Sequence, residues 1–360
     1  MPDGLNILIM GATYGSLLAS KLILAGHSCT MVCLPDEADV INSDGLRLRI
    51  PVKGRDGLLD VHPTSAPGAG SVSAVGPDQA SPSDYDLVAL AMQEPQYRLP
   101  GVRDLLTRTA SSGTPAMSIM NMPPLPYLAR LPGIDVNALR DCFADPTVWD
   151  GLDPDMMTLA SPDPQAFKPP EEPLNLLQVT LPTNFQVAAF ANPDHTAMLR
   201  RIEADILNVR FDTGNGMVEL PVKVKVHQSL YVPLAKWAML LTGNYRCITP
   251  DGPQAIRDAV HGDLEQSAQL YDWVKGVCVG LGADPGDLVP FEKYANAASN
   301  LLKPSSAARA LYGGAPFIER VDRLVQTLAR SRGESHALLD KTVSLVEDQL
   351  AQNRAAPDAA

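Results

Sequence analysis

Short, continuous apolar runs separated by a helix-like segment mark the beginning of the chain. The first run is NILIM at residues 6–10, the second is SCTMVC at residues 28–33, and LLASKLILAG lies between them. This order predicts a β-α-β unit, in which a crossover helix joins two parallel strands. Continuous rather than alternating apolar runs are typical of strands that are covered on both faces of a parallel sheet. Similar runs at residues 84–92 (DYDLVALAM) and 115–121 (PAMSIMN) extend the pattern, so we expect an α/β first half.

Proline-rich stretches interrupt this pattern twice. Residues 63–83 (PTSAPGAGSVSAVGPDQASPS) show no periodicity and predict a mobile surface loop. Residues 144–173 form a second insertion of the same kind. The pattern then predicts a hairpin-like pair of strands at residues 175–180 and 185–190, a helix at 195–207 and a strand at 208–212.

Beyond about residue 223 the strand-like runs disappear and helical patterns replace them. Apolar residues recur at spacings of three and four in residues 230–248, 253–282 and 317–333. We therefore predict an all-helical second half. The expected boundaries are 1–222 for the sheet domain, with insertions near 51–83 and 144–173, then 223–350 for the helical domain and 351–360 for a flexible tail.

Composition narrows the class of partner. The chain has 360 residues, a net charge of -12 and no dense block of Lys or Arg, which argues against binding to nucleic acid or to an anionic membrane surface. A small molecule is the expected partner. The five cysteines form no C-x-x-C pair, so we expect neither a metal site nor a disulfide framework. A cleavable leader and a membrane-length apolar run are both missing, and the expected location is cytoplasmic.

The stretch GATYGS at residues 11–16 lies where the first strand meets the first helix. A dinucleotide-binding loop normally reads G-x-G-x-x-G, in which the glycines make a tight turn, admit the pyrophosphate and let helix pack on strand. Gly11 suits the first role. Without a gap, Thr13 and Ser16 take the other two places; in a loop one residue shorter, Gly15 is the last glycine and the middle one is missing. The candidate cofactor-binding residues are Gly11, Ala12, Thr13, Tyr14, Gly15 and Ser16.

The end of the second strand bears on which dinucleotide would bind. An acidic residue there holds the ribose of NAD, whereas an arginine holds the 2′-phosphate of NADP. This chain has Leu34 and Pro35 followed by Asp36 and Glu37, without a basic residue. The charge pattern leans away from NADPH, although a residue from a distant loop could reverse that, so NADH and NADPH both stay open.

Several segments together resemble the ketopantoate reductase (2-dehydropantoate 2-reductase) family. The similar segments lie in order along nearly the whole chain: GSLLASKLILAGHSCTMVC, VINSDGLRLRI, DYDLVALAMQEPQ, MSIMN, AKWAMLLTGNYRCI and KPSSAARALYGGAPFIERVDRLV. The resemblance implies a Rossmann-type dinucleotide-binding domain followed by a helical substrate and dimerisation domain, an arrangement like that of 6-phosphogluconate dehydrogenase. It also implies reduction of a 2-keto acid by NADPH or NADH, and a possible homodimer.

The resemblance assigns roles residue by residue. Lys236 corresponds to the catalytic lysine, and Glu319 to the carboxylate near the substrate. Further positions correspond to Asn121, Asn244 and Ser306 (or Ser305) at the substrate and to Gln93 at the cofactor. Lys236 lies in an apolar helix pattern, so partial desolvation would suit it as a general acid.

Each of these residues also has a purely structural interpretation. Lys236 can extend an apolar stem from a half-buried helix into water. Glu319 can be a solvated carboxylate paired within its helix. The asparagines and serines can form turns or helix caps.

Departures from the family pattern leave three hypotheses open. Gln93 replaces a lysine, Leu240 replaces an asparagine one turn after Lys236, and Met122 replaces a glycine after Asn121. The first hypothesis is an NAD(P)H-dependent reductase of a 2-keto acid, or of a related carbonyl or imine, with a bulkier or more apolar substrate. The second is ketopantoate reductase itself. The third is a non-catalytic relative that binds a nucleotide or another ligand.

Overall fold

The chain divides into two compact units in the computed structural model, which describes residues 4–161 and 165–356. The first unit comprises Met1–Met92, Gln96–Tyr127 and Thr147–Gln228. The second comprises Gln93–Pro95, Leu128–Pro146 and Ser229–Ala360. Each unit has its own secondary-structure class, and we describe them separately.

A mostly parallel sheet forms the centre of the first unit. Its eight described strands have the order β14-β11-β8-β7-β6-β1-β2-β5, and only the β8–β11 pair is antiparallel. Their bounds are β1 Asn6–Met10, β2 Ser28–Val32, β5 Val72–Val75, β6 Leu87–Leu90, β7 Ala116–Ile119, β8 Met157–Ala160, β11 Phe185–Ala188 and β14 Val224–His227. The helices of this part are α1 Tyr14–Leu24, α2 Pro35–Asp44, α3 Pro100–Ser112 and α5 Pro193–Asn208, and the short α4 (Leu125–Leu128) follows on the way to the second unit.

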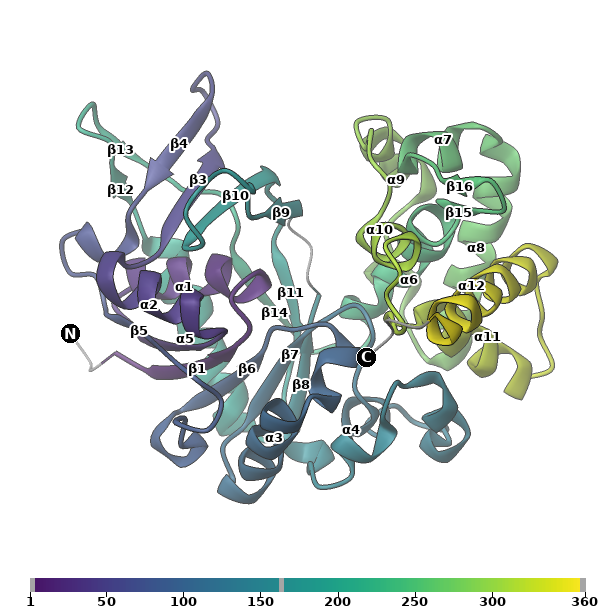
Figure 1. Ribbon diagram of the computed structural model, residues 1–360, viewed down its shortest axis with the longest axis horizontal. Coiled ribbons are helices and arrows are strands. Elements are labelled where there is room, and N and C mark those ends of the chain that lie inside the picture. Colours follow the sequence, from purple (N-terminus) through teal and green to yellow (C-terminus); the bar gives the residue numbers. More distant parts are fainter. Residues whose placement is uncertain (1–3, 162–164, 357–360) are drawn as a thin grey trace. The chain divides into compact units, whose positions relative to one another are not determined.

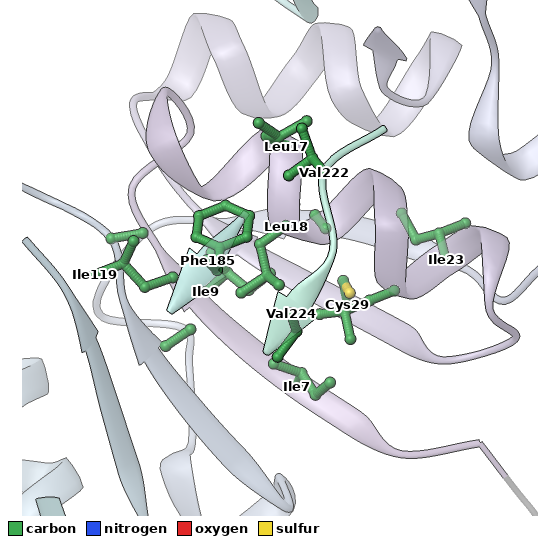
Figure 2. Packing of buried hydrophobic residues seen from close by; sticks show 14 of the residues in the cluster. Ile7, Ile9, Leu17, Leu18, Ile23, Cys29, Ile119, Phe185, Val222 and Val224 are labelled. Atoms are coloured by element: carbon green, nitrogen blue, oxygen red, sulfur yellow. The ribbon is translucent and has the colours of Figure 1, made fainter. Parts of the chain in front are cut away.

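The predicted β-α-β unit is confirmed. β1 pairs in parallel with both β2 and β6, and its residues Ile7 to Met10 are fully buried. A strand in this position is covered on both faces, which is why its apolar run does not alternate. Figure 2 shows Ile7 and Ile9 of β1 packed with Leu18 of α1 in the core of this unit.

A second, four-stranded sheet lies on the other side of α1 from β1. Its order is β4-β3-β10-β9, and the bounds are β3 Arg47–Pro51, β4 Leu58–Val61, β9 Gln165–Phe167 and β10 Leu176–Leu181. Leu48 and Ile50 of β3 join the same core as β1. Figure 1 shows this sheet above α1 and β1 below it. A two-residue ladder of β12 (Phe211–Asp212) and β13 (Met217–Val218) completes the unit, so the strand expected at residues 208–212 is real but short.

The two proline-rich stretches were wrongly interpreted as structureless. Residues 63–83 contain β5, which pairs in parallel with β2 along four residues. Residues 144–173 contain β8, a buried strand between β7 and β11. Both strands are only four residues long, and β5 is an edge strand with one neighbour. So short a run has too little periodicity to be recognised between turn residues.

The hairpin predicted at residues 175–190 is also wrong. Its first strand, β10, pairs with β3 and β9 in the second sheet, whereas β11 pairs with β14 and β8 in the main sheet. Pro182 lies between them and lacks the backbone N–H that a ladder needs. The neighbours of β10 therefore come from distant segments rather than from the next strand along the chain.

Helices dominate the second unit, as the apolar spacing predicts. They are α6 Lys236–Met239, α7 Ile256–His261, α8 Leu264–Leu281, α9 Phe291–Ala298, α10 Ser306–Tyr312, α11 Val321–Ser331 and α12 Ala337–Ala355. A small ladder of β15 (Ile248–Thr249) and β16 (Gly252–Pro253) accompanies them. In α11 the spacing of three and four is evident, because Val321, Leu324, Val325 and Leu328 are all buried.

Strands do not end at residue 223, contrary to expectation. β14 begins at Val224 and pairs with β11 at the edge of the main sheet. Its side chains alternate, with Val224 and Val226 buried and Lys225 exposed, which is the pattern of a strand with one covered face. At the other end, α12 continues to Ala355 into the expected tail, and residues 357–360 lie outside the described residues. None of the described helices is long and apolar enough to cross a membrane.

Candidate functional site

Gly11 ends β1 in a conformation that only glycine adopts easily. Its φ is +107°, and a Cβ there would lie 2.5 Å from Met92 Cγ and 2.6 Å from the Ala91 carbonyl oxygen. Its backbone N–H donates to the Val32 carbonyl at 2.9 Å, which holds the turn against β2. Gly11 therefore makes the tight turn that a phosphate-binding loop needs.

Gly15 packs α1 against β1. A Cβ on Gly15 would lie 2.5 Å from Ile9 Cγ2 and 3.3 Å from Met31 Cε. This is the role of the last glycine of the dinucleotide fingerprint, so the loop corresponds to the alignment that is one residue shorter. The middle glycine is missing, and Thr13, whose side chain is exposed, precedes the first helical residue.

Backbone N–H groups, rather than side chains, are the candidate hydrogen-bond donors to an anion at this loop. No side chain caps the N-terminus of α1. The Ser16 hydroxyl is buried and donates to the Ala12 carbonyl, so it stabilises the loop itself. Unpaired amides at a helix N-terminus favour a phosphate group. Gly15 and Ser16 thus support the loop through packing and a hydrogen bond, while the Gly11 N–H is already paired with Val32.

An ion pair follows the end of β2. Lys168, just beyond β9, contacts the Glu37 carboxylate in the first turn of α2, and both side chains are mostly buried. Burial and Glu37 raise the pKa of the nearby Cys33 thiol to about 11, while Lys168 opposes the shift. In a Rossmann-type sheet the ribose of the cofactor lies at this strand end. A cation is therefore present there, although it lies far away in the sequence.

Lys236 begins a helix whose second half is a π-helix. α6 covers Lys236–Met239, and the π-helical turn covers Leu240–Asn244. A Cβ on Gly243 would lie 2.0 Å from the Tyr294 hydroxyl oxygen, and that hydroxyl donates to the Met239 carbonyl at 3.0 Å. The absence of a side chain at Gly243 thus allows Tyr294 to hold the widened turn. π-turns of this kind are frequent at functional sites.

The π-turn changes which residues share a face. Asn244 lies eight residues beyond Lys236, a separation of about 2.2 turns in a regular α-helix. A π-turn uses i→i+5 bonds and takes up about one extra residue, which brings the span close to two turns. Lys236 and Asn244 are therefore placed on the same side of the helix, and both are half-buried.

Two hydroxyl groups join the other candidate segments to this helix. The Ser305 hydroxyl donates to the Asn244 carbonyl at 2.7 Å and accepts from the Ala308 N–H at 3.1 Å, which makes Ser305 the cap of α10. The Tyr245 hydroxyl donates to the Glu319 carbonyl and accepts from the Val321 N–H. Asn244, the Ser305–Ser306 turn and Glu319 therefore meet within the second unit.

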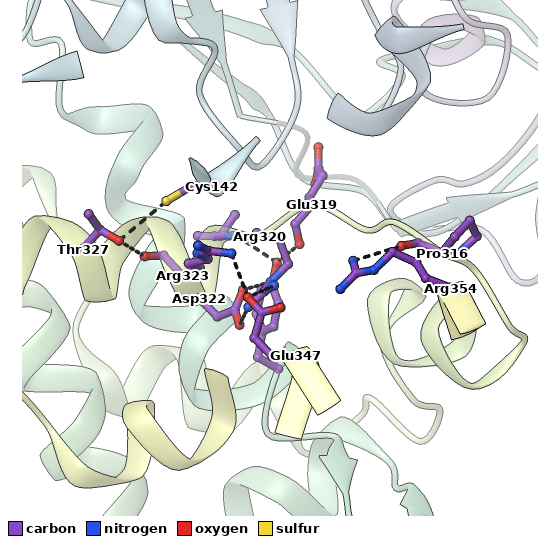
Figure 3. Close-up of polar contacts among 11 residues, drawn as sticks. Cys142, Pro316, Glu319, Arg320, Asp322, Arg323, Thr327, Glu347 and Arg354 are labelled. Carbon is purple, nitrogen blue, oxygen red and sulfur yellow. Dashed lines mark hydrogen bonds and ion pairs between the residues drawn. The ribbon is translucent and has the colours of Figure 1, made fainter. Parts of the chain in front are cut away.

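Glu319 is buried, so the alternative interpretation of this residue as a solvated carboxylate paired within its helix is wrong. It precedes α11 and is 7% exposed, and its Oε1 accepts the Glu94 N–H at 3.4 Å. Figure 3 shows that the Glu319 side chain points away from the ion cluster that Arg320 enters. In that cluster Arg320 binds Asp322 through two hydrogen bonds and Glu347 through one.

The remaining candidates lie in separate places. Asn121 is half-buried in the first unit, shortly after β7, and Gln93 is half-buried in the second unit, shortly after β6 in the sequence. Ser306 is exposed at the first position of α10. The five cysteines are free thiols. Across residues 4–161 and 165–356, no three His, Cys, Asp or Glu side chains gather closely enough to hold a metal ion.

Two features of the candidate site were not predicted from the sequence. The Lys168–Glu37 pair joins residues 131 positions apart, and no local pattern links them. Glu94 is an almost fully buried carboxyl group next to Glu319. The available signal was a charged residue shortly after an apolar strand run, separated from it by Gln93 and followed by Pro95.

Comparisons with known proteins show which solved structures share this architecture. No protein-family model matches the sequence, and no curated protein matches it significantly. Solved structures do match. The 2-dehydropantoate 2-reductase from Methylococcus capsulatus has a TM-score of 0.60 at 13% identity, over 98% of this chain and 99% of that one. The ternary structure of D-mandelate dehydrogenase with NADH and anilino(oxo)acetate has a TM-score of 0.61 at 12% identity, over 97% and 99%.

A third similar structure is the dimeric ketopantoate reductase from Staphylococcus aureus, with a TM-score of 0.58 at 12% identity, over 97% of this chain and 100% of that one. The likeness covers nearly the whole chain in each case and is far stronger in structure than in sequence. The chain therefore has the ketopantoate reductase fold, a Rossmann-type parallel sheet followed by a helical C-terminal region.

Proposed function

We propose that the protein is an NAD(P)H-dependent reductase of a 2-keto acid or a related carbonyl or imine compound. One observation carries the proposal: the segments that bear Lys236, Asn244, Ser306 and Glu319 meet in the second unit through the Ser305 and Tyr245 hydroxyl groups. These segments are far apart in the sequence, and a fold that needed them only as caps and turns would not have to bring them together.

In this proposal the nicotinamide cofactor supplies a hydride to the carbonyl carbon. The Lys236 ammonium group donates a proton to the oxygen on which negative charge develops, so that the carbonyl becomes a hydroxyl group. Glu319 balances the charge of the lysine and orients it or the substrate. Asn121, Asn244 and Ser306 bind the substrate as neutral hydrogen-bonding groups. Residues 11–14 form the turn that holds the pyrophosphate at the N-terminus of α1, and Gln93 is a further cofactor-binding residue.

We propose a substrate that is more apolar than ketopantoate. Leu240, which replaces a family asparagine, lies one turn beyond Lys236 and is mostly buried. A similar structure is that of D-mandelate dehydrogenase with anilino(oxo)acetate, a ligand with a ring. Ketopantoate itself is the second candidate, supported by the presence of Lys236, Asn244 and Glu319 in family order.

Separate titrations with NADH and NADPH, followed through nicotinamide fluorescence, test the proposal. We expect binding of at least one dinucleotide, and its oxidation with a panel of 2-keto acids that includes ketopantoate and the keto acid of D-mandelate. If neither dinucleotide binds, the enzyme proposals fail and the non-catalytic relative is favoured. Binding and oxidation with ketopantoate alone would favour the second candidate.

We also propose a homodimer, since the Staphylococcus aureus enzyme of the same fold is described as dimeric. Light scattering coupled to size-exclusion chromatography measures the mass of the particle directly. A mass near 38.5 kDa, that of a single chain, would contradict the dimer.

A further inference from the structure

Glu94 is a buried acid without a cation. Its side chain is 1% exposed, and its two carboxyl oxygens lie 3.2 and 3.3 Å from the Ala144 amide nitrogen, which donates to them. Among the residues that the structure describes, no Lys, Arg or His side chain forms an ion pair with it. A carboxylate removed from water without a cation is costly, and a protonated carboxyl group is not.

The neighbours of Glu94 add negative rather than positive charge. Glu319 is buried beside it and accepts its N–H, and Asp145 follows Ala144 in the chain. Burial raises the pKa of Glu94 to about 8, with Glu319 and Asp145 adding to the shift and the amides of Ala144 and Asp145 opposing it. The Glu319 carboxyl oxygen accepts the backbone N–H of Glu94, so two buried carboxyl groups lie on neighbouring parts of the chain, and their mutual repulsion favours the retention of one proton.

We propose that Glu94 is a positioning residue for Glu319: it keeps its proton at neutral pH, so that the two carboxyl groups together carry a single negative charge. This inference rests on the proposed function, because the role of Glu319 at the substrate belongs to that proposal. The consequence is a limit on activity at alkaline pH. When Glu94 ionises, a second buried negative charge opposes Glu319 and weakens the binding of an anionic substrate, which raises KM.

The retained proton can be tested without catalysis. A carboxyl group whose pKa is raised on folding binds more protons in the folded than in the unfolded state, so its contribution to stability falls as pH rises from about 4.5 to about 8. Glu94→Gln keeps the shape and an acceptor oxygen but does not titrate. We expect the melting temperature of this variant, relative to the wild type, to rise steadily across that interval.

A flat difference in melting temperature would overturn the inference. Glu292→Gln, at an exposed position of α9, is the matched control and should give a flat difference. If Glu94→Gln does not fold, Glu94→Met gives the same comparison, since methionine is of similar length and carries no proton.

The positioning role is tested by the pH dependence of turnover. Between about pH 7 and about pH 9, we expect kcat/KM for a 2-keto acid to fall in both proteins, by at least about fivefold more in the wild type than in Glu94→Gln. The difference between the two proteins should come from KM rather than from kcat. Equal losses in both proteins, together with a rising melting-temperature difference, would overturn the positioning role. If no protein turns over any keto acid, the proposed function fails, and the melting-temperature comparison still decides whether Glu94 holds a proton.

Discussion

Gly15 lies so close to Ile9 that a Cβ on the glycine would be 2.5 Å from Ile9 Cγ2. The contact joins the first helix to the central strand directly behind the glycine loop. Ile9 is fully buried and branched, so it cannot move aside without disturbing the sheet core. The position of α1, and with it the helix N-terminus that faces the loop, depends on this missing side chain.

Replacement of Gly15 by alanine should therefore separate α1 from β1. We expect a loss of about 1 to 3 kcal/mol in the free energy of unfolding, as for other overpacked cores, and weaker dinucleotide binding. Urea denaturation and nicotinamide fluorescence measure the two effects. Gly276→Ala is the control, because a Cβ there meets nothing within 4 Å on α8 and alanine should slightly stabilise the helix. Equal stability of both variants would show that Gly15 is not needed for packing.

Replacement of Lys236 by alanine should leave dinucleotide affinity unchanged while turnover falls by orders of magnitude. The proposed role of Lys236 is to give a proton to the developing alkoxide, a step that cofactor binding does not involve. Fluorescence titration and steady-state kinetics on the same preparation separate the two. Lys275→Ala, at a lysine paired with Asp272 on α8, is the control. Unchanged turnover in Lys236→Ala would remove this lysine from the catalytic role.

Changes at Glu37 and Lys168 should shift the choice between NADH and NADPH in opposite directions. Glu37→Gln frees the Lys168 ammonium group for a 2′-phosphate, so we expect NADPH to gain about tenfold or more in affinity relative to NADH. Lys168→Ala leaves the Glu37 carboxylate unbalanced and should disfavour NADPH. The ratio of the two dissociation constants is the measurement. A ratio that stays the same in both variants would place the ribose elsewhere.

Asp322 should matter far more to stability than Arg323. Asp322 is fully buried and holds Arg320 through two hydrogen bonds of 2.9 and 3.0 Å, whereas the Arg323–Glu347 pair is about one-third exposed. Asp322→Ala leaves a buried guanidinium with one partner fewer, and we expect a loss of about 3 to 5 kcal/mol. Arg323→Ala should cost about 0 to 1 kcal/mol. Similar urea midpoints for the two variants would contradict this ranking.

Lys21 should make stability rise at alkaline pH. Its ammonium group is buried and donates to the Leu220 and Pro221 carbonyls, next to Val222 with its positive φ of 68°. Burial, and then Lys223, lower the pKa of Lys21 from 10.5 to about 8. Between these two values the unfolded state binds more protons than the folded state, so the contribution of Lys21 to stability increases with pH.

The comparison with Lys21→Met isolates this effect, because methionine does not titrate. We expect the stability of the wild type relative to the variant to increase from about pH 8 to about pH 10.5 in urea denaturation. Lys53→Met, at an exposed lysine, should show no such trend. A constant difference for Lys21→Met would mean that Lys21 is already solvated in the folded state.

Local patterns predicted the elements that are buried on both faces or that repeat over several turns. NILIM and SCTMVC became β1 and β2, and the three-and-four spacing of residues 317–333 became α11. Short strands were missed for a physical reason. β5 and β8 have four residues each, and their stability comes from pairing with β2 and β7 rather than from their own composition.

The sequence by itself determined the class of the fold, because burial imposes a periodicity on each strand and helix. It also determined the order of the candidate groups Lys236, Asn244, Ser306 and Glu319, which is the order of the ketopantoate reductase family that the sequence resembles. Only the tertiary structure decided which groups meet. It selected the shorter glycine loop through the contact of Gly15 with Ile9. It also paired Lys168 with Glu37 and brought the backbone N–H of Glu94 to the Glu319 carboxyl group. Such contacts join residues more than a hundred positions apart, except within the loop, and they depend on packing that no local pattern encodes.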